Sequence, residues 1–142
     1  MLEFIQPRLG SERWIDRYTG MLAFGAILEG PNPDTICNYT SQAFEGILNM
    51  INDPVQRVRH TVSYVYYRLS EFVAGPILND KNLRDLFVGN FLNHIDEHPI
   101  IGSLLAGSLK NLYIKAYYRG NTFIMNEYFS AVFSKIFSKL FD

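Results

Sequence analysis

The feature that most constrains the fold is a self-similarity that recurs every 42 to 43 residues. Its clearest copy is Asp53-Pro54-Val55-Gln56-Arg57-Val58-Arg59, at the head of an apolar periodic stretch. Aspartate is a common helix cap and proline is tolerated at the first helical position, so we expect a helix to begin here. Ser11 lies 42 residues before Asp53, and Asp96 lies 43 residues after it. Three helix starts are therefore predicted in phase.

Positions inside these predicted helices keep the same phase. The three aligned sets are Ala23, Val65 and Ser108; Phe24, Tyr66 and Leu109; and Ile27, Leu69 and Leu112. Between the starts lie further stretches with apolar residues at helical spacing, over residues 44–51, 83–95 and 129–140. Each unit is thus predicted to be a pair of antiparallel helices, here called helix A and helix B.

Helix-breaking residues stand where helix A should turn into helix B. They are Gly30-Pro31-Asn32-Pro33-Asp34 in the first unit, Gly75-Pro76 with Asn79-Asp80 in the second, and Arg119-Gly120-Asn121 in the third. Units of this length built from two helices are typical of HEAT and armadillo repeats. The Asp-Pro-x-x-x-Val-Arg pattern favours HEAT, a class that uses an aspartate and an arginine at this spacing to link neighbouring repeats. We therefore predict structural links between repeats at Arg17, Asp53 and Arg59.

The predicted fold is all-α, an α-α superhelix of about three HEAT repeats that forms one segment over residues 1–142. Residues 1–10 would be the end of a preceding helix B, and the repeats would span 11–52, 53–95 and 96–142. Terminal repeats of a solenoid normally carry a polar outer face. Here the chain ends in apolar residues, namely Phe133, Ile136, Phe137, Leu140 and Phe141. We expect uncovered stacking faces at both ends, as in a piece of a longer protein or in an oligomer.

Composition excludes several classes of protein. The 142 residues carry 13 basic and 14 acidic side chains with no basic patch, so we expect no nucleic-acid partner. Cys37 is the single cysteine, which rules out an intrachain disulfide and fits a reducing compartment. The longest nearly apolar run, 99–109, has eleven residues and predicts no membrane span. The first six residues lack a basic region and a cleavage site, so no signal peptide is expected.

The sequence gives little support for catalysis. His60, His94 and His98 have no metal-ligand spacing, and no Walker A, G-x-G-x-x-G or G-x-S-x-G pattern is present. His94 and His98 with Asp96 and Glu97 resemble an acid–base group only in composition, because inter-repeat turns ordinarily carry such caps and solvated residues. We predict no catalytic residues, no metal and no cofactor.

The polar positions of the B helices form a candidate partner-binding surface, since B helices line the concave face of HEAT solenoids. Removing the apolar stripes leaves Asn38, Gln42, Glu45 and Asn49 on the first B helix, and Asn82, Asp85, Gly89, Asn93 and Asp96 on the second. Amides and carboxylates at these spacings favour a ligand with basic groups. The alternative is an ordinary solvated face, although such faces usually carry more Lys and Glu.

The segment Met21-Leu22-Ala23-Phe24-Gly25-Ala26-Ile27-Leu28-Glu29-Gly30-Pro31 is similar to the middle of the solenoid in the importin beta family. Phe4-Ile5 also lies at the family's distance from Trp14 and Phe24. The resemblance is strong over residues 4–71 and loose over 72–142. Gly102 stands where the family carries an arginine. The 119–122 connection is short and lacks the acidic residues usual in the matching repeat.

The second predicted helix A carries three aromatic residues close together, namely Tyr64, Tyr66 and Tyr67. Near-adjacent positions on a helix point in different directions, so helix packing is the favoured interpretation and at most one ring could anchor a partner. Tyr64 is the candidate, because the family resemblance places an aromatic residue there. Trp14, near a helix start, is also expected to be a packing residue.

The resemblance implies a segment of a nuclear transport receptor that shuttles between cytoplasm and nucleus. It implies binding of protein cargo, or of a basic importin-alpha-type adaptor segment, during nucleocytoplasmic protein import. Ran and nucleoporins would be partners only as part of a full-length receptor, whose N-terminal Ran-binding repeats and FG-motif sites are not evident. The alternative is a HEAT-repeat structural scaffold for protein complex assembly unrelated to transport; an enzyme is a distant third.

Overall fold

The computed structural model describes residues 2–28 and 41–141, and within these ranges the chain is helical without strands. The elements are α1 (Leu2–Leu9), α2 (Trp14–Ile27), α4 (Ser41–Asn49), the 3-10 turn η1 (Met50–Asn52), α5 (Gln56–Phe72), α6 (Ala74–Asn79), α7 (Lys81–His94), α8 (Pro99–Tyr118) and α9 (Thr122–Phe141). This arrangement confirms the predicted all-α helical-hairpin solenoid.

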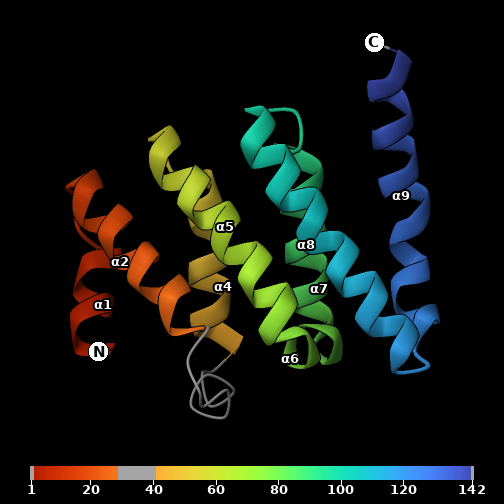
Figure 1. Cartoon of the computed structure of the whole chain (residues 1–142), viewed down its shortest axis with the longest axis horizontal. Helices are drawn as coiled ribbons and strands as arrows, with labels where there is room; N and C mark the ends of the chain where they lie inside the picture. The colour runs from red at the N-terminus through yellow and green to blue at the C-terminus, as the bar shows by residue number, and fades with distance from the viewer. Residues whose placement is uncertain (1, 29–40, 142) are drawn as a thin grey trace.

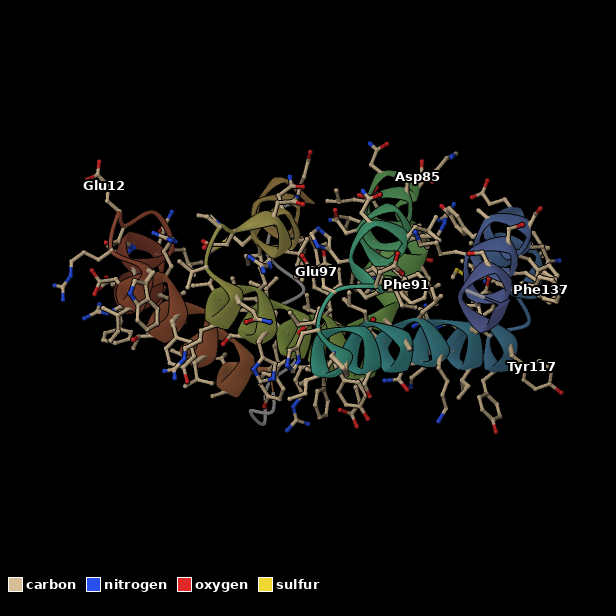
Figure 2. All side chains as sticks on the ribbon, turned by 90° about the horizontal axis from the view of Figure 1, so that it is seen from above. Glu12, Asp85, Phe91, Glu97, Tyr117 and Phe137 are labelled. Atoms are coloured by element: carbon tan, nitrogen blue, oxygen red, sulfur yellow. The ribbon has the colours of Figure 1, made fainter. Side chains whose placement is uncertain are left out.

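The helices form two layers (Figure 1). The A layer consists of α2, α5 and α8, which lie side by side in chain order. The B layer consists of α1, α4, α7 and α9, and Figure 2 shows it on the other side of the A helices. Each repeat therefore contributes one helix to each layer, and neighbouring repeats stack along the long axis of the molecule.

The A helices begin two residues later than the sequence predicts, but in the predicted phase. Their N-cap residues are Arg13, Val55 and His98, which keep steps of 42 and 43 residues. Ser11 and Asp53 are not the caps, because each side chain accepts a hydrogen bond from the backbone N–H two residues on and forms a turn before the helix.

The third helix start differs from the other two. Asp96, predicted as its cap, is instead 3.0 Å from Lys135 of α9. His98 caps α8 by accepting a hydrogen bond at Nδ1 from the N–H of Ile100, and Pro99 occupies the first helical position. The expectation of an in-phase start is correct here, whereas the predicted capping residue is wrong.

The turn in the second repeat is also displaced from its predicted position. Gly75 and Pro76 lie inside the short helix α6, and helix α5 ends instead at Phe72, followed by the C-cap residue Val73 with φ and ψ of -129° and 32°. Proline is tolerated there because it falls in the first turn of α6, where a backbone N–H has no intrahelical acceptor. Asp80, one of the predicted turn residues, caps α7 by accepting from the N–H groups of Asn82 and Leu83. The predicted turn at 30–34 lies outside the described residues.

The core lies between the two layers and includes a buried polar group. The aligned residues Phe24, Tyr66 and Leu109 are all buried, as their shared repeat position predicts. The Tyr66 hydroxyl donates to the Leu48 carbonyl at 2.6 Å and accepts from the Asn90 amide at 2.8 Å. One side chain thus joins α4, α5 and α7, while its ring packs on Phe87 at 4.7 Å between centroids.

Contacts within the A layer pair a tyrosine with a glycine. Tyr64 of α5 lies against Gly25 of α2, and Tyr67 of α5 lies against Gly107 of α8; a Cβ added at either glycine would meet the ring at 2.9 Å. The missing side chain leaves room for the ring. Tyr66 is fully buried, so the interpretation of these tyrosines as packing residues agrees with the contacts of all three.

Large apolar side chains are exposed at both ends of the stack, as expected. Phe4 and Leu22 are exposed at the N-terminal end, and Phe133 and Phe137 at the C-terminal end. Figure 2 shows Phe137 on the side of α9 that faces away from the other helices. The side chains of Leu140 and Phe141 are not among those the structure describes.

No helix in the described part of the chain is both long enough and apolar enough to span a membrane. Within residues 2–28 and 41–141, no three His, Cys, Asp or Glu side chains gather as a metal site would require.

Candidate functional site

The candidate site is a depression of about 440 Å³ on the B layer, between α4 and α7. Glu45 of α4 and Asn82 and Asp85 of α7 line it, together with Leu83 and Leu86. Figure 2 shows Asp85 at the surface of the B layer, on the side away from α8. The structure therefore brings together three side chains that the sequence singled out from two different helices.

The remaining candidates on the B helices do not line this depression. Asn49 and Asn93 are exposed on α4 and α7. Asp96 connects the α7–α8 turn to α9 through its ion pair with Lys135. Asn38 and Cys37 lie outside the described residues, as does the side chain of Gln42.

Asp85 is held by two neighbours. Its carboxylate lies 3.0 Å from the Lys81 ammonium and accepts a hydrogen bond from the Tyr128 hydroxyl of α9. The Tyr128 hydrogen bond, followed by that from Lys81, lowers the pKa of Asp85 below its ordinary value. Burial, with the same hydrogen bond, raises the pKa of Tyr128. Asp85 is therefore ionised and oriented, but part of its charge is already balanced.

Of the two carboxylates in the depression, Glu45 is the one whose charge is not balanced by a neighbouring described residue. Its side chain is exposed, and no ion pair or hydrogen bond joins it to another residue that the structure describes. Asp85, by contrast, lies beside Lys81, whose ammonium is also 4.0 Å from Glu127 of α9. The depression is thus acidic on its α4 side and mixed in charge on its α7 side, a division that the sequence pattern did not predict.

The sequence indicates one partner of Asp85 more directly than the other. Lys81 is four residues before Asp85 on one helix, a spacing that signals a possible ion pair. Tyr128 is 43 residues away, one repeat later, so the repeat period places the two side chains at equivalent positions of neighbouring B helices. The period could therefore have identified this contact, although helical spacing alone could not.

The residues predicted to link neighbouring repeats form contacts between successive repeats. Arg17 binds Asp53 of the next repeat through Nε at 2.7 Å and Nη2 at 3.2 Å, and this hydrogen bonding raises the pKa of Arg17. Arg59 binds Glu97 of the following repeat at 3.2 Å. Each arginine also donates to the carbonyl of its own repeat, Arg17 to Ser11 and Arg59 to Asp53.

A further chain of polar contacts connects repeats through His94 and Glu97, residues that resemble an acid–base group only in composition. His94 Nε2 lies 2.8 Å from Asn52 Oδ1, and His94 Nδ1 lies 3.3 Å from Glu97 Oε1. Glu97 in turn contacts Arg59. Figure 2 shows Glu97 between the two layers. His94 and Glu97 thus serve as links among three repeats.

Tyr64, the aromatic residue proposed as a partner anchor, lies outside the B-layer surface. It lies on α5 in the A layer, where its ring packs on Gly25 and its hydroxyl accepts a hydrogen bond from Arg68 Nε at 3.0 Å. The side chain is half-buried by these contacts. Its placement follows from the helix to which it belongs, since A and B helices face opposite sides of the stack.

Comparison with curated proteins finds importin beta subunits among the similar sequences. The chain is 29% identical over 112 residues to importin subunit beta-1 of Saccharomyces cerevisiae and 30% identical over 112 residues to that of Schizosaccharomyces pombe. In both cases the match covers 79% of this chain and 13% of the relative. The chain thus spans only a small fraction of the length of these relatives. No protein-family model matches it.

Comparison with solved structures gives the same result. A chain of the Kap95:Nup1 complex superimposes with a TM-score of 0.84 at 25% identity, covering 94% of this chain and 15% of the solved one. A second structure, which describes Kap95p binding and the switch loops of RanGDP, matches with the same TM-score, identity and coverage.

Proposed function

The chain is a HEAT-repeat segment of the importin beta family, and from this premise we propose that it binds a basic protein segment in nucleocytoplasmic protein import. The observation that carries the proposal is the depression that gathers Glu45, Asn82 and Asp85 between α4 and α7. Carboxylates and an amide supply acceptors for the ammonium and guanidinium groups of a basic ligand. The relatives suggest the setting, and the depression suggests the kind of ligand.

The form of the ligand is proposed from the residues that line the depression. Glu45 and Asp85 come from neighbouring parallel-stacked B helices, and Leu83 and Leu86 lie beside them. An amphipathic helix can place basic groups on the carboxylates while its aliphatic side chains contact the two leucines. We therefore propose an adaptor segment of the importin-alpha type, or basic cargo, as the occupant.

The setting of this activity is part of the same proposal. The similar solved structures are described with Nup1 and with RanGDP, which makes nucleoporins and Ran candidate partners of a longer receptor that contains such a segment. Shuttling between cytoplasm and nucleus is the localisation that fits these partners. Neither catalysis nor a cofactor is needed for a binding role of this kind.

The test is a titration of the chain with a fluorescent basic helical peptide, followed by anisotropy at low and high salt. We expect binding that weakens as salt rises, since the charges are exposed. Glu45→Lys should weaken binding about tenfold, which corresponds to ~1.4 kcal/mol. Glu12→Lys changes the charge equally at the N-terminal end of the molecule, distant from Asp85 in Figure 2, and should leave affinity unchanged. Absence of binding at low salt would refute this role for the isolated chain.

Glu45 is a cleaner target than Asp85 for this experiment. Reversing the charge of Asp85 also removes the acceptor of the Tyr128 hydrogen bond and the partner of Lys81, so lost binding could reflect a displaced α9. Asp85→Asn keeps an acceptor for Tyr128 and serves as the second variant. A weaker peptide affinity with an unchanged melting temperature would support direct recognition by this carboxylate.

The alternative function is a structural scaffold that holds partners through its stacking faces. The observation that favours it is the exposure of large apolar residues at both ends of the stack, among them Leu22 and Phe133. For such a scaffold, the charge reversal at Glu45 would have almost no effect on partner binding. Retained binding of a natural partner by Glu45→Lys would therefore favour the scaffold.

A further inference from the structure

We propose that Lys81 of α7 is an internal competitor of the basic partner: its ammonium takes the place that a basic group of the partner would occupy, and so limits the partner's affinity. Lys81 lies beside the depression that Glu45, Asn82 and Asp85 line. The inference rests on the proposed binding of a basic segment and adds the residue that regulates it. It also extends the acceptor surface to Glu127 of α9.

The Lys81 ammonium lies between carboxylates of two B helices. It is 3.0 Å from Asp85 Oδ2 on its own helix and 4.0 Å from Glu127 Oε2 on α9. The other oxygen of Asp85, Oδ1, accepts the hydrogen bond from Tyr128. Both oxygens of Asp85 are therefore engaged, and an incoming ammonium must displace Lys81 or approach a charge of its own sign. Like charges at such distances repel, so the lysine opposes a basic ligand.

The Lys81 side chain can give way to a ligand. It is 63% exposed, and the side chains of its partners Asp85 and Glu127 are 48% and 45% exposed. Exposed ion pairs of this kind are weak and are screened by salt. Lys81 is also the first residue of α7, where the positive end of the helix dipole disfavours a cation. Neither the ion pair nor the helix therefore gains much stability from a lysine at this position.

Arg84, one turn further along α7, is the structural cation of the same helix. Its side chain is only 13% exposed, and its guanidinium lies 3.9 Å from Glu127. This contact and the hydrogen bond between Tyr128 and Asp85 join α9 to α7 without involving the lysine. Loss of the lysine charge should thus leave the fold intact and change only the electrostatics in front of the carboxylates.

Displacement of the lysine would free acceptors on two helices. Asp85 Oδ2 and Glu127 Oε2 both lie within reach of the one Lys81 ammonium, so a single basic group of a partner can contact both. Glu45 borders the depression on the α4 side. A basic segment bound here would cross α4, α7 and α9, with one basic group at Glu45 and another in the place of the Lys81 ammonium.

The test compares Lys81→Met with the wild type in the anisotropy titration with the basic helical peptide. Methionine keeps an unbranched side chain and removes the charge. We expect Lys81→Met to bind the peptide about three- to fivefold more tightly at low salt, the range that an exposed ion pair allows. The difference should shrink as salt rises. Equal or weaker binding by Lys81→Met would overturn the inference.

Lys110→Met is the matched control, because it changes the net charge of the chain by the same amount. Lys110 is exposed on α8, in the A layer, and so lies outside the proposed binding surface. The peptide affinity of this variant should equal that of the wild type. A gain as large as that of Lys81→Met would show that net charge alone sets the affinity, which would contradict internal competition. Circular dichroism should give both variants the helix content of the wild type.

A second pair of variants tests whether Lys81 acts through the carboxylates. Glu127→Gln removes the charge on α9 and keeps an oxygen that faces Arg84. Because Lys81 shields Glu127 from the peptide, Glu127→Gln should weaken binding about threefold in the Lys81→Met background and less in the wild-type background. An equal loss in both backgrounds would mean that the lysine does not compete for this carboxylate, and the inference would fall.

The same titrations separate this inference from the proposed function. Wild-type binding that Lys81→Met does not strengthen would overturn internal competition alone and leave the basic-segment role standing. Absence of binding by both proteins at low salt would refute that role and the inference with it.

Discussion

The Tyr66 hydroxyl connects three helices inside the core, from α5 to the Leu48 carbonyl of α4 and the Asn90 amide of α7. The Leu48 carbonyl lies where α4 passes into the 3-10 turn η1, a point at which α-helical hydrogen bonding ends. A buried carbonyl without a partner would be costly, so the hydroxyl satisfies a group that the helix end leaves open. Burial raises the pKa of Tyr66, and the group stays neutral.

Replacing this hydroxyl should therefore destabilise the fold. We expect Tyr66→Phe to lower the free energy of unfolding by about 1 to 3 kcal/mol, because it leaves the Leu48 carbonyl and the Asn90 amide with only their long mutual hydrogen bond of 3.5 Å. Urea unfolding followed by circular dichroism measures the loss. Tyr117→Phe removes a hydroxyl from an exposed ring and should have no effect. Equal stability of Tyr66→Phe and wild type would show that this buried network contributes nothing.

Asp85 gives a prediction about pH. The Tyr128 hydrogen bond and Lys81 lower its pKa in the folded state, so the resulting stability is present above the ordinary pKa of 3.8 and is lost as the pH falls through the lower folded value. Tyr128→Phe should raise the pKa of Asp85 toward its ordinary value and reduce this acid-dependent loss. An NMR titration of the carboxyl group measures the shift, and an unchanged pKa would contradict it.

At the scale of helices, the repeat period predicts more than local signals do. The period places the caps Arg13, Val55 and His98 in phase, whereas residue preferences identify Ser11, Asp53 and Asp96 in their place. Local preference fails because Ser11 and Asp53 hydrogen-bond within turns and Asp96 reaches α9. The first two are local turns and the third is a contact of the α7–α8 turn with α9, and a capping rule considers neither kind of contact.

At the candidate site, too, some features could be predicted from the sequence and others could not. The polar positions of α4 and α7 follow from subtracting the apolar stripe of each helix, and three of them line one depression. The balance of charge does not follow from that subtraction, because Tyr128 and Glu127 reach α7 from the next repeat. Sequence reasoning thus identifies which residues face the surface, while the stacking of repeats determines which of their charges are already paired.

Two glycines on different helices should respond to alanine in opposite directions. Gly102→Ala would place a Cβ 2.6 Å from the Ile95 carbonyl oxygen and should cost about 1 to 3 kcal/mol. Gly46 lies inside α4 with open space around its Cβ position, so Gly46→Ala should stabilise the protein by about 0.5 to 1 kcal/mol. Thermal unfolding compares the two variants, and a Gly102→Ala protein as stable as the wild type would show that α8 can shift without cost.

For the whole molecule, stability should be distributed by repeat. Each unit contacts only its neighbours, so a solenoid behaves approximately as a sum of repeat and interface terms. The interface between the first two repeats includes the Arg17–Asp53 pair, whose side chains are largely buried. The interface between the second and third repeats includes the Arg59–Glu97 pair and the large contact of α5 with α8. Weakening one interface should loosen the repeat beyond it more than the rest of the stack.

Arg17→Met tests this expectation, because it removes the charge from the first interface and leaves Asp53 without its partner. We expect a loss of about 1.5 to 3 kcal/mol in the protection of backbone amides in α2, measured by hydrogen exchange in the native state. Amides of α8 should keep their protection, since no contact of Arg17 extends to the third repeat. Arg59→Met is the matched variant and should lower protection in α8 as well, because its interface lies in the middle of the stack. A uniform loss across all helices in Arg17→Met would mean that the three repeats unfold as one cooperative unit, and that interface terms cannot be assigned to single repeats.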